Sequence, residues 1–161
     1  AINATILHIP TIIGAMAAGP KVGAMTGFFF GMFSFIQAFR SPAVMMQFAS
    51  SYNPLYALII CVVPRVAIGW IAWKLFRILP GKLAVRAGGA AVITTFLHTV
   101  MFLSLFYLLV GVPFAQHQGV SPVAVAEMLA GIAGANGIPE AIVAGVITAP
   151  ILSALYRIGN R

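Results

Sequence analysis

The stretch Gly14–Gly31, GAMAAGPKVGAMTGFFFG, sets small residues four apart in the most apolar part of the chain. The small residues are Ala15, Gly19, Gly23, Gly27 and Gly31. A spacing of four keeps residues on one face of a helix, and small residues there let another backbone approach closely. The Gly19-Pro20 pair interrupts the run, because glycine favours a helix end and proline favours the first turn of the next helix. The stretch therefore predicts two helices joined by a tight turn.

The composition indicates that these helices lie in a membrane. Of the 161 residues, 61% are hydrophobic and 7% are charged, whereas about 25% of residues are charged in a soluble domain. The nine basic residues outnumber the two acids, but they lie at the ends of apolar runs, so they report membrane orientation rather than a nucleic acid partner. We expect an all-α integral membrane protein, a compact helical bundle in contact with the lipid bilayer.

Apolar runs and turn signals divide the chain into helices within one transmembrane domain, residues 1–161. A polar segment, residues 43–53, predicts a loop, and residues 112–139 predict a long connection that contains a Ser121-Pro122 helix start. The predicted helices cover residues 6–18, 22–39, 55–79, 83–111 and 138–156, with a short interfacial helix over residues 122–133.

The basic residues predict the orientation of the bundle. Seven of the nine fall at ends that share one face by alternation, namely Lys21, Lys74, Arg77, Lys82, Arg86, Arg157 and Arg161. Basic residues mark the cytoplasmic side, so the sequence would begin outside and end inside. A chain that starts outside without a preceding span is unusual, and we expect a first helix to be missing from this sequence or separated from it.

Ionisable side chains within the predicted spans are the candidate site residues, because such groups are costly in lipid and turn toward protein or a cavity. Arg65 lies about ten residues into its helix, and Glu140 lies one turn into the last helix at a similar outer depth. One interpretation is an ion pair that joins the two helices. The other is that Arg65 meets an anionic ligand while Glu140 or Asn136 accepts its hydroxyl or amide hydrogens.

A narrow polar patch, Thr94, Thr95, His98 and Thr99, interrupts the fourth predicted helix. His98 is either a ligand-binding residue or an interhelical hydrogen-bond partner. It lacks companions at metal-site spacing, so no metal site is expected. Tyr107 is either part of an interfacial aromatic belt or part of a pocket lining.

The sequence offers little for catalysis. It contains no phosphate-binding loop and no Asp to hold magnesium. It also lacks paired carboxylates and a nucleophile with an adjacent base. We expect no enzyme activity, no catalytic residues and no cofactor. What remains is a small bundle that binds something near its outer face and takes energy from a partner.

Four stretches, in order, resemble the substrate-binding S subunits of energy-coupling-factor (ECF) vitamin transporters. They are LHIPTIIGAMAAGPKVGAMTGFFFGMFS (7–34), PRVAIGWIA (64–72), TTFLHTVMFLSLFYL (94–108) and NGIPEAIVAGVITAPI (136–151). The H-I-P followed by G-P-K-x-G is the most specific of these features. The resemblance implies a six-helix fold, of which five spans are visible here, in a bacterial plasma membrane.

The resemblance also implies a function and partners. Such subunits bind one vitamin with high affinity from outside and dock onto a membrane coupling protein, the T component, which carries two cytoplasmic ATPases. Pantothenate is the expected cargo because the H-I-P pattern is most like the pantothenate-type members. Folate or riboflavin, or a membrane assembly subunit that binds no vitamin, are the alternatives.

Carried onto this chain, the pocket regions of the family contain the polar residues singled out above. The expected substrate-binding residues are Asn3, His8, Arg65, His98, Tyr107, Asn136 and Glu140. The small residues Ala15, Gly19, Gly23 and Gly27 either pack the first two helices inside the bundle or form a smooth docking face for the coupling protein.

Overall fold

The fold was analysed in a computed structural model that describes residues 6–40 and 44–159, and nearly all of these are helical. In chain order, the elements are η1 (Ile6–His8), α1 (Ile9–Ala18), α2 (Pro20–Ala38), α3 (Val44–Tyr52), α4 (Pro54–Ile78), α5 (Leu83–Gln118), α6 (Pro122–Ile132), the π-helix η2 (Ala133–Gly137) and α7 (Ile138–Gly159). Three helical runs are long and apolar enough to cross a membrane, namely α4, α5 and the continuous run Pro122–Gly159. The all-α membrane fold class is thus confirmed.

Proline, glycine and capping residues set the helix ends. Pro10 lies in the first turn of α1, and Gly19 ends that helix with a φ of 97° before Pro20 starts α2. The Ser121 side chain accepts a hydrogen bond from the Ala124 amide and so caps α6. These residues suit helix ends because the first N–H groups and the last C=O groups of a helix have no partner within the helix.

The prediction of a loop over residues 43–53 is wrong, because Val44–Tyr52 forms α3. The serines that suggested a loop are compatible with a helix. The Ser50 hydroxyl is buried and lies 3.0 Å from the Gln47 carbonyl and 3.3 Å from the Ala38 carbonyl of α2. Asn53 then caps α4 by accepting from the Leu55 amide. The polar residues thus tie α3 to the end of α2.

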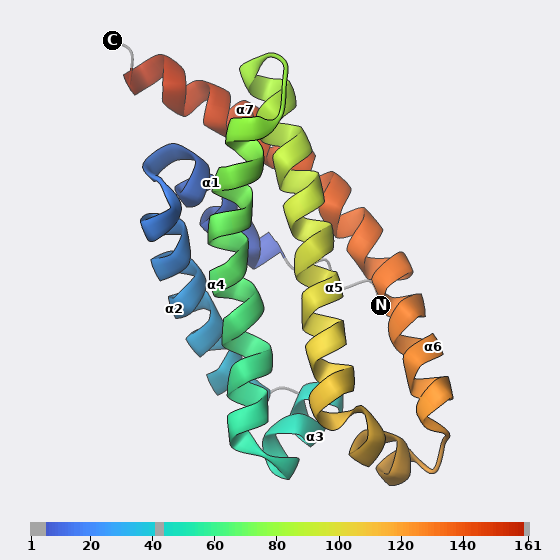
Figure 1. Ribbon diagram of the computed structural model, residues 1–161. Helices are drawn as coiled ribbons and strands as arrows, with labels where there is room; N and C mark the ends of the chain where they lie inside the picture. The colour runs from blue at the N-terminus through green and yellow to red at the C-terminus, as the bar shows by residue number, and fades with distance from the viewer. Residues whose placement is uncertain (1–5, 41–43, 160–161) are drawn as a thin grey trace.

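The predicted long connection over residues 112–139 is also wrong. Helix α5 continues through Pro113 to Gln118 and ends at Gly119, whose φ of 68° is left-handed. Prolines are tolerated in membrane helices because neighbouring groups satisfy the freed backbone. Beyond the turn, α6 does not end as a separate interfacial helix, since it runs through η2 into α7 (Figure 1).

The small residues of α2 face α4 in the tightest packing of the bundle. A Cβ added at Gly27 would overlap the Arg65 carbonyl, and one added at Gly31 would lie 2.8 Å from the Val62 Cα. At Gly23 an added Cβ would overlap the Ala15 side chain and lie 3.0 Å from the Gly69 Cα. The backbones of α2 and α4 therefore touch directly, as small residues allow.

This packing bears on the docking alternative. Ala15, Gly23 and Gly27 are buried between α1, α2 and α4. Gly19 is half-buried at the turn, with nothing within 4 Å of a Cβ added there. The geometry favours packing inside the bundle over a docking face. The sequence predicted packing between the first two helices, whereas the main neighbour of the α2 glycines is α4.

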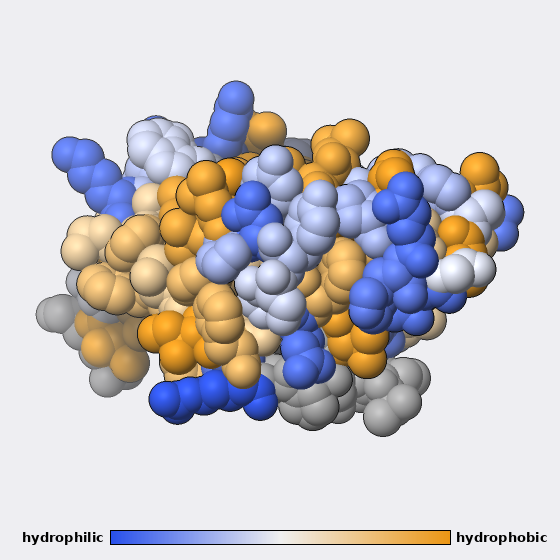
Figure 2. Space-filling model, turned by 90° about the horizontal axis from the view of Figure 1, so that it is seen from below, coloured by the Kyte–Doolittle hydropathy of each residue, from blue (hydrophilic) through white to orange (hydrophobic). Residues whose placement is uncertain are grey.

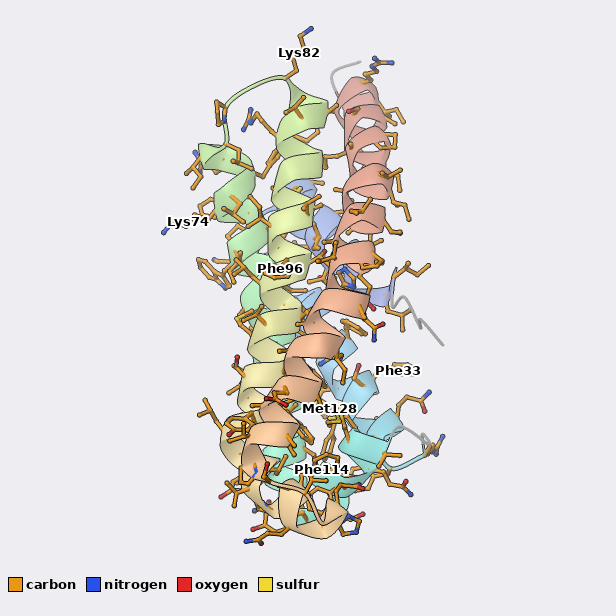
Figure 3. The ribbon with its side chains drawn as sticks, turned by 90° about the vertical axis from the view of Figure 1, so that its right-hand side faces the viewer. Phe33, Lys74, Lys82, Phe96, Phe114 and Met128 are labelled. Atoms are coloured by element: carbon orange, nitrogen blue, oxygen red, sulfur yellow. The ribbon has the colours of Figure 1, made fainter. Side chains whose placement is uncertain are left out.

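The two ends of the bundle differ in charge. The α1–α2 turn, the α4–α5 turn and the end of α7 lie toward one end, while α3 and the α5–α6 turn lie at the other (Figure 1). Lys82 projects from the first end and Lys74 from the side below it (Figure 3). Viewed from the α3 end, hydrophilic and hydrophobic residues are mixed across the face (Figure 2). We call these the basic end and the α3 end.

Candidate functional site

A cavity of about 340 Å³ lies where η1, α3, α4, α5 and the α6–η2–α7 run meet. Its residues come from α3 at one end of the bundle and from the middle of α4 and α5 (Figure 1). The lining consists of His8, Met45, Met46, Arg65, His98, Thr99, Phe102, Leu103, Ile132, Asn136 and Glu140. Polar groups thus meet in an apolar chamber, the usual form of a small-molecule site.

Arg65 projects from α4 into this chamber and is only 9% exposed. Its Nη1 donates to the Cys61 carbonyl of the same helix at 2.7 Å. The guanidinium carbon lies 4.7 Å from the ring centre of Phe30 and 5.5 Å from that of Phe102. Its Nε has no hydrogen-bond partner among the residues that the structure describes. This buried cation in the cavity lining therefore keeps a donor that no described residue satisfies.

His8 and His98 form a second polar group in the cavity wall. The His8 Nε2 lies 3.0 Å from the buried Thr95 hydroxyl, which ties η1 to α5. The two imidazole rings are stacked with centroids 5.7 Å apart. Within the described part of the chain, the His98 Nε2 is buried without a hydrogen-bond partner. Buried polar groups in proteins are nearly always paired, so this nitrogen is a candidate contact for a bound molecule.

Asn136 and Glu140 reach the cavity from a widened turn. Residues 133–137 form a π-helix, a rare element that is common at functional sites. Pro139, the second residue of α7, has no N–H to donate to the preceding turn. Gly137 is buried against α5, where an added Cβ would lie 3.1 Å from Thr99 Cγ2. Both polar side chains line the same cavity as Arg65.

A second cavity of about 400 Å³ adjoins the first on the α2 side. The two share Met46, Arg65 and Phe102 in their linings. The second is lined in addition by Ser34 and Gln37 of α2. The Arg65 guanidinium therefore lies where the two chambers meet.

Comparison with known proteins places this architecture in a family. The family model for the ECF transporter substrate-specific component matches residues 1–152. The chain belongs to this family. It is also 27% identical over 167 aligned positions to the pantothenic acid transporter PanT of Lactococcus lactis subsp. cremoris (strain MG1363), which covers 99% of this chain and 81% of that protein. The resemblance noted in the sequence is thus confirmed.

The structure of this substrate-specific component brings most of the predicted site residues together. His8, Arg65, His98, Asn136 and Glu140 all line the one cavity. Tyr107 does not, since it lies with Ser104 in a separate apolar groove between α5 and α6. Asn3 lies outside the described residues.

The apolar part of the cavity was missed from the sequence. Met45 and Met46 were assigned to a loop, and the α5 residues Phe102 and Leu103 look like any other apolar residues of a membrane span. The available signal was the spacing of Thr95, Thr99, Phe102 and Phe106, which keeps one face of α5 continuous for three turns.

Proposed function

We propose that this substrate-specific component binds pantothenate with high affinity in the Arg65 cavity. The observation that carries the proposal is the buried Arg65 side chain in the cavity lining, whose Nε has no hydrogen-bond partner among the described residues. A carboxylate accepting from that edge would neutralise a buried cation, and Arg favours such planar, forked pairing. The identity with PanT, although modest, supports the same cargo class.

The remaining groups of pantothenate match the other residues of the cavity lining. Asn136 and Glu140 offer amide and carboxylate oxygens for hydroxyl and amide hydrogens. The His98 Nε2 supplies one more polar contact. Phe102, Leu103 and Ile132 provide the apolar surface for the two methyl groups. The cavity lies toward the α3 end, whereas Lys82 and the other basic residues of the helix ends lie mostly at the opposite end. By the positive-inside rule we take the α3 end as the outer one.

Calorimetric titration of the purified protein with pantothenate, folate and riboflavin tests the proposal. We expect one pantothenate per chain and no comparable heat with the other two. The Arg65→Lys variant keeps the charge but loses the fork, and we expect it to weaken binding by roughly tenfold or more. Arg40→Lys, exposed and outside the cavity lining, is the matched control.

Tight binding of folate or riboflavin in place of pantothenate would reassign the cargo. Absence of any vitamin ligand, with Arg65→Lys changing stability alone, would favour a membrane assembly subunit.

We propose further that the bound vitamin is released inside after docking to a membrane coupling subunit and two ATPases in the cell membrane. The family supports this partnership, and the chain carries no phosphate-binding loop of its own. Uptake into vesicles that hold the chain with and without these partners tests it. ATP-dependent uptake should need all of them, and equal uptake by the chain alone would contradict the proposal.

A further inference from the structure

Another pocket lies at the basic end, apart from the Arg65 cavity. It measures about 410 Å³ and lies among the ends of α1, α4 and α7 and the start of α5. Its polar wall consists of Arg77, Arg86 and Tyr156, with Trp73 and Phe76 beside them. No residue lines both this pocket and the Arg65 cavity.

Arg86 is held in the pocket wall by the end of α4. Its Nε and Nη2 donate to the Phe76 carbonyl at 3.1 and 2.7 Å, and its guanidinium carbon lies 4.7 Å from the Phe76 ring centre. The residue four positions after Phe76 is Pro80, which has no N–H to offer that carbonyl. Arg86 takes the place of the missing donor. The bonds fix the guanidinium while leaving its Nη1 outside them.

Arg77 supplies a second, more accessible cation. Its guanidinium carbon lies 5.0 Å from the Trp73 ring centre, and its side chain is exposed. The two acids of the chain, Glu127 and Glu140, belong to α6 and the start of α7. The lining of the pocket, drawn entirely from described residues, contains both arginines and no carboxylate. Two guanidinium groups thus face one pocket without a counter-ion, which favours an anionic ligand.

The setting of the pocket favours a lipid over a soluble anion. Trp73 and Tyr156 are residue types enriched where the membrane meets water. Ile78 and Val85, next in sequence to the two arginines, are exposed apolar side chains that offer a path for acyl chains. Basic pockets between helices on the cytoplasmic side are suited to lipid headgroups. We propose that this pocket binds the phosphate headgroup of an anionic phospholipid of the cytoplasmic leaflet, between Arg77 and Arg86.

Fluorescence quenching by brominated lipids tests the proposal. The chain has two tryptophans, so the Trp70→Phe variant leaves Trp73, in the pocket wall, as the reporter. In phosphatidylcholine vesicles we expect brominated phosphatidylglycerol to quench Trp73 at lower mole fractions than brominated phosphatidylcholine does. Adding Arg77→Gln should reduce this preference about fivefold, the effect of one basic residue near an anionic surface. Lys74→Gln, a basic neighbour outside the pocket lining, is the matched control and should keep the preference.

Three outcomes would overturn the proposal. Equal quenching by the two lipids would show that the pocket does not select a headgroup. If Lys74→Gln weakened the preference as much as Arg77→Gln, the preference would come from general surface charge and not from the pocket. Loss of the preference on adding millimolar glycerol phosphate would assign the pocket to a soluble anion. If instead Arg77→Gln abolished assembly with the ATPase-bearing partner while the lipid preference stayed intact, the pocket would be a protein-docking site.

Discussion

The two sides of α4 differ in how closely they are packed. On the α2 side, glycines bring two backbones into contact, and the Arg65 carbonyl lies against Gly27. On the α5 side, the side chain of the same residue lines a cavity of about 340 Å³, and its Nε has no hydrogen-bond partner within the described ranges. One residue therefore belongs both to a close backbone contact and to the lining of a cavity.

The contrast shows how the cavity can keep the Arg65 Nε without a hydrogen-bond partner among the described residues. A buried donor without a hydrogen-bond partner costs roughly 1–3 kcal/mol of folding free energy. If the helices around the cavity could move, they would shift to bring an acceptor to that donor. Contact of α2 and α4 backbones leaves α4 little freedom to move, because interiors packed at this density transmit strain rather than yield. Rigidity on one face of α4 thus preserves open space on the other.

Filling the closely packed side should have the largest effect. In Gly27→Leu the new side chain would meet the Arg65 carbonyl and the Val66 backbone, which cannot rotate away. We expect a loss above the roughly 1–3 kcal/mol of ordinary overpacking, seen as aggregation in size-exclusion chromatography. Gly131→Leu is the control, since nothing lies within 4 Å of a Cβ added there. A folded Gly27→Leu protein that still binds vitamin would break the comparison.

Removing the cation should separate binding from stability. Arg65→Met keeps an unbranched stem while deleting the charge, and replacing a buried charge by an apolar group is often neutral or stabilising. We expect pantothenate affinity to fall by about 100-fold or more, with an unchanged or higher thermal midpoint. Calorimetry and thermal unfolding in detergent measure the two effects. Unfolding of the variant would place Arg65 among the residues that hold the bundle together.

Two adjacent threonines give the finest test, because both are fully buried in α5. Thr95→Val removes the hydroxyl that pairs with the His8 Nε2. It should cost roughly 1 kcal/mol. Thr94→Val removes a hydroxyl that has no partner among the described residues, so the thermal midpoint should stay or rise. Equal shifts for both variants would show that the His8 bond contributes nothing specific.

Local backbone chemistry made several helix ends predictable. Gly19-Pro20 and Ser121-Pro122 mark helix boundaries through the conformations that these residues allow, and the structure has boundaries at both. The cavity residues Arg65, His98 and Glu140 could be identified because a polar group within an apolar run needs a specific reason. These signals depend on the residue and its neighbours in sequence.

What the sequence did not reveal depends on partners in space. Ser50 looked like a loop residue because its link to the Ala38 carbonyl of α2 cannot be read from sequence. Tyr107 was predicted to bind substrate, and its hydroxyl can form hydrogen bonds. Its position around α5 instead places it in the groove between α5 and α6. Likewise, the spacing of the α2 glycines predicted a close neighbour but did not identify α4 as that neighbour.

The π-helix at residues 133–137 has a consequence for how the chain tolerates changes of length. Removing one residue from an α-helix turns everything beyond it by about 100°. A π turn holds one residue more than an α turn within a single hydrogen-bonded loop, so a deletion there can restore α geometry without rephasing α6 against α7. Asn136 would leave the chamber wall while the basic end kept its place. A deletion in this long helix is thus best absorbed beside the Arg65 cavity, where it alters the cavity wall and spares the rest of the bundle.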